Sequence, residues 1–377
     1  MSGTCTQRRL GRLGRAGLRG ADRDGPPRLR RPAGRLAFLV LALLGLFGQA
    51  CTSKNLRADL DRSSIGDEDL LALLPRGLDA VLDVDMAGLR RLDSAAELLS
   101  YLPAQSLSHL EKVIDLPLRN LDGLAVGFRS AGTRERDVVV VVRGHLERER
   151  IARGLRALGE TRAVEYHGVP LIEMEGASSA GDAESDGLAA ALLTPRTAVL
   201  ANRLAVRQVI DIYRGVDDGA RQQGDLMAAL GRAPRAKVGR PAVLMAALVT
   251  PPVRDRLRAA DVSELGADAQ YIAAAIAVGD GVDLGVVAAY RELSAAKDVA
   301  TRLLDRAQEL RHRPALTFIG IERYIQPLIA IAAAPAPQKG RHSPELHIAY
   351  RLSSDDLNEL LSRIGKLQRL RDRLSGG

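Results

Sequence analysis

Apolar and polar residues alternate over short runs in much of this chain, a pattern that predicts β-strands separated by turns. In the stretch AVLDVDM, Leu82, Val84 and Met86 fall on one side of a strand. Asp83 and Asp85 fall on the other side, where two carboxylates could bind a cation or share a proton. A solvated strand face explains the same two residues equally well. Either way, the alternation predicts a sheet with one buried and one solvated face.

A second pattern is a spacing of 148 residues between similar blocks. Two β-type runs, 124–128 and 137–142, are followed by one arginine and one amphipathic helix, and the same order repeats after the runs 272–278 and 282–290. Arg143 and Arg291 are 148 residues apart, and so are Arg203 and Arg351 in the closing blocks. Because the order of elements also repeats, the chain is interpreted as two copies of one unit.

Each copy is expected to run helix, strand, helix, β-hairpin, helix, strands, helix. This order predicts an α+β fold with internal duplication, in which helices cover one face of a mainly antiparallel sheet. The predicted domains are residues 67–216 for the first repeat and 217–377 for the second. Residues 1–50 are expected to be a signal peptide, and 51–66 a polar tether.

The N-terminal segment carries the strongest functional signal. A basic stretch ends at Arg35 and is followed by 13 residues, 36–48, that are almost all apolar. A membrane-spanning helix needs about 20 such residues. The run is therefore typical of a secretory signal peptide, with the small residues Gly48 and Ala50 placing signal cleavage after Ala50.

Cys51 directly follows that cleavage site, and in this respect the chain resembles bacterial lipoproteins. In their signal peptides a leucine usually stands where this chain has Gly48. The resemblance covers about the first 51 residues and implies lipid attachment at Cys51. Thr52, in place of an aspartate, implies sorting to the outer membrane, with the protein facing the periplasm or the cell surface. Cleavage without lipidation would instead give a periplasmic or secreted protein.

Charge and aromatic content narrow the classes of partner that the protein is expected to bind. Residues 1–50 hold ten arginines against two aspartates, which equals the net charge of +8 of the whole chain. The part after residue 50 is therefore formally neutral, and no nucleic-acid partner is expected. That part has no tryptophan and two phenylalanines, Phe128 and Phe318, so it offers few rings for stacking on sugars or bases.

No motif in the sequence identifies a reaction. Cys5 leaves with the signal peptide, so Cys51 is the single mature thiol and neither a disulfide nor a cysteine-based zinc site is possible. No catalytic residue, metal site or cofactor is expected, and Asp83 with Asp85 is the best polar cluster. The recurring arginines are interpreted as closing the junctions between strands and helices rather than as a paired anion clamp.

These observations predict an exported, lipid-anchored envelope protein that binds or assembles with other molecules and is not an enzyme. Its expected partners are the membrane, through the N-terminal lipid, and envelope proteins or an apolar ligand. Two alternatives remain: a periplasmic carrier of a lipid or other aliphatic ligand, and a hydrolase whose site is assembled only in space.

Overall fold

The computed structural model describes the chain from Asp69 onwards in several segments. These are residues 69–90, 111, 117, 120–129, 137–174, 187–233, 241–259, 265, 268–312, 330–334, 343–360 and 362–363. The expected signal peptide, tether, Ala50 and Cys51 lie outside the described residues.

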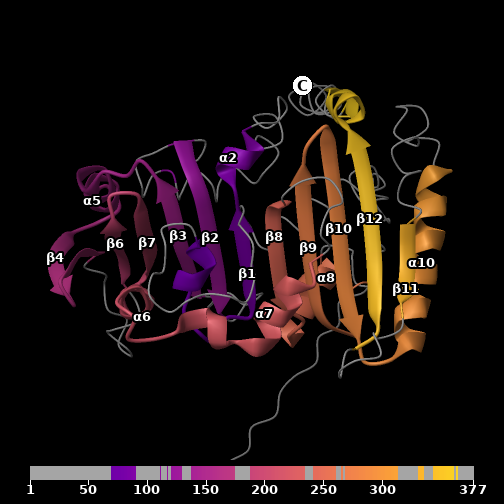
Figure 1. Ribbon diagram of the computed structural model, residues 1–377, viewed down its shortest axis with the longest axis horizontal. Coiled ribbons are helices and arrows are strands. Elements are labelled where there is room, and N and C mark those ends of the chain that lie inside the picture. Colours follow the sequence, from indigo (N-terminus) through magenta and orange to yellow (C-terminus); the bar gives the residue numbers. More distant parts are fainter. Residues whose placement is uncertain are drawn as a thin grey trace, which may run out of the picture.

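Twelve strands form a single sheet in which every neighbouring pair is antiparallel (Figure 1). The order across the sheet is β11-β12-β10-β9-β8-β1-β2-β3-β7-β6-β5-β4. The strands are β1 Ala80–Val84, β2 Leu121–Arg129, β3 Asp137–Gly144, β4 Thr161–Tyr166, β5 Val169–Met174, β6 Leu188–Thr194, β7 Thr197–Asn202, β8 Pro241–Leu248, β9 Ala269–Val278, β10 Gly281–Tyr290, β11 Ala330–Ala334 and β12 Glu345–Ser353. The predicted combination of helices with a mainly antiparallel sheet is confirmed.

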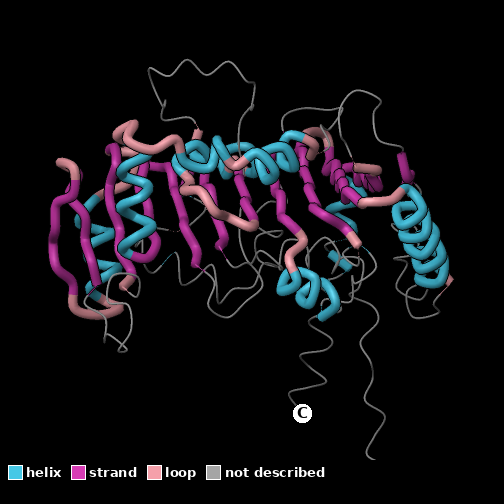
Figure 2. The backbone as a smooth tube through the Cα atoms, turned by 90° about the horizontal axis from the view of Figure 1, so that it is seen from below, coloured by secondary structure: helices cyan, strands magenta, loops and turns pink. Residues whose placement is uncertain are grey.

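Helices lie on both sides of the row of strands (Figure 2). They are η1 Leu70–Leu73, α2 Met86–Leu89, α5 Arg148–Arg156, α6 Arg203–Tyr213, η3 Gly219–Gln222, α7 Gly224–Gly231, α8 Pro251–Ala259 and α10 Leu293–Arg311. Residues 354–360 and 362–363 are also helical. No helix within the described segments combines the length and the apolar character needed to cross a membrane.

Along β1, β8 and β9, alternate residues belong to two separate apolar clusters, which define two faces of the sheet. Face A carries Leu82 and Val84 of β1 and is packed against α5, α8 and α10. Face B carries Val81 of the same strand and is packed against η1, α6 and α7. The expectation that helices cover one face is therefore wrong, because β1 is buried on both sides.

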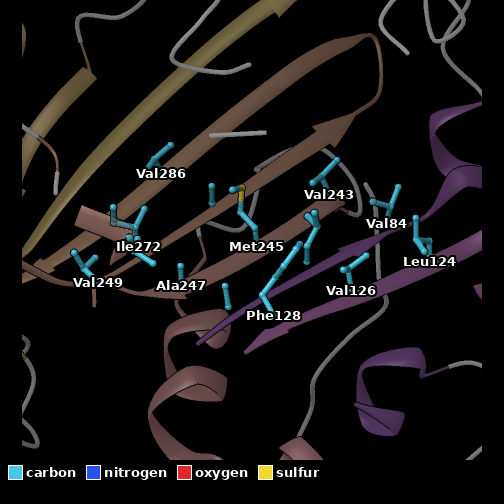
Figure 3. Packing of buried hydrophobic residues seen from close by; sticks show 14 of the residues in the cluster. Val84, Leu124, Val126, Phe128, Val243, Met245, Ala247, Val249, Ile272 and Val286 are labelled. Atoms are coloured by element: carbon cyan, nitrogen blue, oxygen red, sulfur yellow. The ribbon is translucent and has the colours of Figure 1, made fainter. Parts of the chain in front are cut away.

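The middle of the sheet is the pair of strands β1 and β8. Their antiparallel register joins Leu82 to Met245, Ala80 to Ala247 and Val84 to Val243. On face A, Val84, Met245 and neighbouring side chains of β2, β9 and β10 form one apolar layer (Figure 3). Outward from this pair the sheet continues as β2-β3-β7-β6-β5-β4 on one side and β9-β10-β12-β11 on the other.

Candidate functional site

The polar side chains that the structure brings together lie mainly on face B, in two clusters centred on glutamates. The first glutamate is Glu173 of β5, whose exposed fraction is 0%. Val169 and Leu171 precede it at alternate positions and belong to the face B core, so alternation points Glu173 to the same side. We call Glu173 and the arginines around it the Glu173 cluster.

Three arginines from two elements surround this buried carboxylate. Arg162 of β4 approaches Oε2 with Nη2 at 2.7 Å and Nε at 3.0 Å. Arg207 of α6 donates Nη2 to Oε1 at 3.2 Å, and Nε of Arg203 lies 3.7 Å from Oε2. The carboxylate therefore fastens α6 to the outer hairpin β4–β5.

The protonation state of Glu173 follows from these contacts. Burial by itself raises the pKa of a carboxyl group, because it penalises the charged form. Hydrogen bonds and charge from Arg162, followed by those from Arg207, outweigh burial and hold the pKa of Glu173 below its usual value. Glu173 is thus an anion at neutral pH, unsuited to moving a proton.

The same side of α6 makes further contacts with the tip of the hairpin. Asp211, four residues after Arg207, accepts a hydrogen bond from Tyr166 Oη at 3.3 Å and lies 3.4 Å from Nε2 of His167. The Arg207 guanidinium lies 5.6 Å from the centre of the Tyr166 ring. Spacing of four residues puts these α6 side chains in one stripe, so the helix is held along its length.

The backbone at the hairpin tip has a conformation that few residue types adopt readily. His167 and Gly168 have φ angles of 49° and 72°, the positive pair that a two-residue type I′ turn requires. Glycine adopts this conformation readily, whereas a histidine does so uncommonly. The turn fixes the register in which Arg162 stands opposite Glu173.

The second cluster, at the other end of the sheet, is centred on Glu345 of β12. Its Oε1 accepts hydrogen bonds from Tyr271 Oη of β9 at 3.1 Å and from Arg232 at the end of α7. Nε2 of His347 lies 3.2 Å from Oε2. Ala289 of β10 lies between Tyr271 and Glu345 in the ladder, and its small side chain lets them meet. These four polar residues form the Glu345 cluster.

Burial and the carboxylate also set the pKa values of the donors in this cluster. Burial, followed by the charge of Glu345, raises the pKa of Tyr271 to about 12. Burial alone would lower the pKa of Arg232, but its hydrogen bond to Glu345 and the nearby Tyr271 raise it. Arg232 thus stays charged and anchors the end of α7 to β12.

Chemically, the two clusters differ in what they can do. The Glu173 cluster is a fixed set of charges, rich in guanidinium groups. The Glu345 cluster contains a carboxylate that contacts one ring nitrogen of a histidine, an arrangement that can orient an imidazole for proton transfer. Within the described segments, no group of three or more histidine, cysteine, aspartate or glutamate side chains is placed to hold a metal ion.

The carboxylates singled out in the sequence have different environments. Asp83 has an exposed fraction of 0%, so the expectation of a solvated face is wrong for it: face B is covered there by helices. Asp85 lies just after β1 and caps α2, its Oδ1 accepting from the Gly88 backbone N–H at 2.8 Å. The two residues therefore do not form one exposed pair.

The recurring arginines also have separate environments. Arg203 packs against Glu173, whereas Nε of Arg351 lies 3.4 Å from Asp283 at the opposite end of the sheet. Arg143 lies over Gly123 of β2 on face B. The four do not line one cleft, since Arg143 of β3 and Arg203 of α6 belong to one half of the sheet, whereas Arg291, directly after β10, and Arg351 belong to the other half.

Comparisons with known proteins do not assign the chain to a family. No protein-family model matches the chain, and no curated protein matches it. Among solved structures, crystal form I of TP0453 is similar, with 11% sequence identity and a TM-score of 0.39. The similarity covers 81% of this chain and 99% of that one. A likeness this weak carries no argument about function.

Proposed function

We propose that the protein is an exported, lipid-anchored protein of the cell envelope with a non-catalytic binding or assembly role. The observation that carries this proposal is the apolar run 36–48, which ends in Gly48-Gln49-Ala50-Cys51 after a basic stretch. Cleavage after Ala50 would place Cys51 at the mature N-terminus. By its resemblance to lipoproteins, the protein would then be held at the outer membrane by acyl chains on that cysteine.

The distance between Cys51 and the sheet suits such a tether. Seventeen residues, 52–68, separate Cys51 from Asp69, where the described fold begins. A fully extended chain of this length spans at most about 60 Å. The sheet body can thus work close to the membrane or some distance from it.

We also propose that the body arose by duplication of one unit. The sheet order supports this, since β1-β2-β3-β7-β6 and β8-β9-β10-β12-β11 make the same steps outward from the β1–β8 pair, and the first half then adds β5 and β4 at its edge. The central register is self-complementary: Leu82 pairs with Met245, and residues two positions away pair reciprocally. A local two-fold axis normal to the sheet, between Leu82 and Met245, would relate the halves. An experimental structure in which residues 67–216 and 223–366 fail to superpose would contradict the duplication.

Lipid attachment is tested by mass spectrometry of the protein isolated from membranes of its own cells. The chain offers a matched pair of variants, because it has two cysteines, Cys5 and Cys51. We expect an N-terminal peptide that starts at Cys51 and carries acyl chains, in both the wild type and Cys5→Ser. Cys51→Ser should lose the acyl mass and leave the membrane fraction. An unmodified Cys51, or a mature start elsewhere, would contradict the proposal.

The binding role is tested on the same preparation. Crosslinking before extraction, followed by identification of copurifying proteins and extracted lipids, separates an assembly partner from an apolar ligand. A stoichiometric envelope protein supports assembly, whereas a stoichiometric lipid retained by Cys51→Ser supports the carrier. If neither a protein nor a lipid copurifies in stoichiometric amounts, that result counts against a binding role.

A further inference from the structure

His167, at the tip of the β4–β5 hairpin, is the one non-glycine residue with a positive φ angle in the described part of the chain. Glycine and asparagine are the usual occupants of such a turn position. An uncommon backbone conformation persists where the surrounding structure holds it, and it often marks a site with a task. The position of His167 therefore points to a role for its imidazole ring.

The carboxylate of Asp211 faces this ring from α6. Its Oδ2 accepts the hydrogen bond from Tyr166, and its Oδ1 lies 3.4 Å from Nε2 of His167. Within the described segments, Oδ1 is buried and accepts no hydrogen bond. A buried acceptor without a partner costs stability, because it has lost its hydration. Since a charge-assisted N–H···O bond measures about 2.7–2.9 Å, a small closing movement of the ring would supply that bond.

The charged and titratable groups around the imidazole come from the hairpin and from α6. Tyr166 stays neutral, because burial, followed by the charge of Asp211, raises its pKa. Arg207 lies 5.6 Å from the centre of the Tyr166 ring, and Nη2 of Arg214 lies 3.3 Å from where a Cβ of Gly168 would be. Both arginines disfavour a positive imidazole, whereas Asp211, which directly contacts the ring nitrogen, favours it.

We propose that His167 and Asp211 form a pH-sensitive contact that holds the tip of the β4–β5 hairpin against α6 in acid. As pH falls, the imidazole takes up a proton, and its Nε2–H donates to Oδ1 of Asp211. The closed contact binds this proton more tightly than the open one. Its stabilisation is therefore fully present below the usual titration range of histidine, about pH 6.5, and is lost as pH rises through that range.

This contact goes beyond the proposed anchoring and binding role, because it requires only the folded chain. The test uses residues 51–377 with Cys51→Ser, in which lipid attachment plays no part. Amide hydrogen exchange of β4 and β5 is measured at about pH 5.5 and about pH 7.5 and corrected for the intrinsic pH dependence of exchange. Since the side chain of His167 is 52% exposed, we expect protection to be about threefold higher at the lower pH.

Two variants remove one member of the contact each. His167→Asn suits the turn, and Asp211→Asn keeps the shape of the side chain, so each should fold and reduce the gain to less than about 1.5-fold. His145→Asn is the matched control, because His145 is exposed and makes no ion pair within the described part of the chain. The control should keep the full wild-type gain.

The outcomes separate a pH-sensitive contact from a merely structural one. Should His167→Asn not fold, Asp211→Asn decides alone, because it leaves the sequence of the turn unchanged. Equal protection of the wild type at both pH values would overturn the proposal. So would a gain that survives in Asp211→Asn, or one that His145→Asn loses as fully as His167→Asn, since the titrating group would then lie elsewhere.

Discussion

Glu173→Gln removes the one negative charge from the Glu173 cluster while keeping the shape of the side chain. The structure allows its cost to be estimated. Arg162 and Arg207 donate to opposite oxygens of a fully buried carboxylate, and a glutamine offers only one acceptor oxygen. Hydrogen bonds to charged groups contribute roughly 1.5–3 kcal/mol each, and breaking a buried pair costs about 3–5 kcal/mol. Because Arg162 is half exposed, we expect about 3 kcal/mol of lost stability.

The assay is urea unfolding of residues 51–377 followed by circular dichroism. With a slope of about 3 kcal/mol per M, the expected loss moves the midpoint down by about 1 M. Glu147→Gln is the matched control, since the Glu147 side chain is 51% exposed and pairs with nearby Arg150 on the same helix end. An exposed pair of this kind contributes at most about 1 kcal/mol, so the control midpoint should hardly move.

The pH dependence gives a second and independent readout. The folded pKa of Glu173 lies below its usual value of 4.5, so its contribution to stability is present above that pH. It is lost as pH falls through the folded pKa, where the folded carboxylate also takes up a proton. The difference between wild type and Glu173→Gln should be constant from about pH 6 to 8 and shrink below about pH 4.5. A difference under about 0.5 kcal/mol at pH 7, or one that persists undiminished in acid, would refute the reasoning.

Three other substitutions test the core, the Glu345 cluster and a helix end. Tyr271→Phe should lower stability by about 1 kcal/mol at neutral pH. Since the folded pKa of Tyr271 is about 12 against 10.0 unfolded, alkaline unfolding should show that difference shrinking as pH rises from 10 to 12. Leu82→Ala, at a fully buried site in the central strand, should cost about 2–5 kcal/mol in the same urea assay; a change below about 1 kcal/mol would contradict the described packing. Asn202→Ala removes the side chain that accepts the Ala205 backbone N–H at 2.8 Å, and should cost about 1 kcal/mol, whereas Asn202→Asp should keep most of that stability.

Much of the sheet follows from the hydrophobic pattern alone. The predicted runs 124–128 and 137–142 fall within β2 and β3, and 272–278 and 282–290 fall within β9 and β10. β3 contains a run of valines, and β9 and β10 are joined by a short turn with glycine. β11 is different, because its sequence AIAAA has no alternation and alanine favours helix. Only pairing with β12 makes it a strand.

The polar clusters were harder to predict from the sequence, because many of their residues lie far apart along the chain. The contact between Arg162 and Glu173 could have been predicted, because a turn at His167-Gly168 puts these residues opposite each other. Arg207 and Arg203 approach the same carboxylate only because α6 packs back over face B. The Glu345 cluster joins residues up to 113 positions apart. Contacts of that kind depend on the order of strands, which a hydrophobic pattern does not specify.

Two rows of three residues, one in each half of the sheet, have opposite patterns of side-chain size. In the first half, Gly123, Arg143 and Thr197 stand side by side on β2, β3 and β7. In the other half, Tyr271, Ala289 and Glu345 stand side by side on β9, β10 and β12. One row has a large residue between two small ones, and the other has the reverse. The guanidinium of Arg143 lies 3.3 Å from where a Cβ of Gly123 would be, so that position has no room for a larger side chain unless Arg143 moves.

Size complementarity of this kind constrains which changes each half can accept. Replacing Ala289 by a large residue would separate Tyr271 from Glu345 and so remove a hydrogen bond as well as crowding the row. Placing a large residue at Gly123 would collide with Arg143 unless the arginine were lost at the same time. Exchange between the two arrangements therefore requires linked substitutions on adjacent strands. The hydrogen bond between Tyr271 and Glu345 thus depends on a small residue at position 289 of the strand between them.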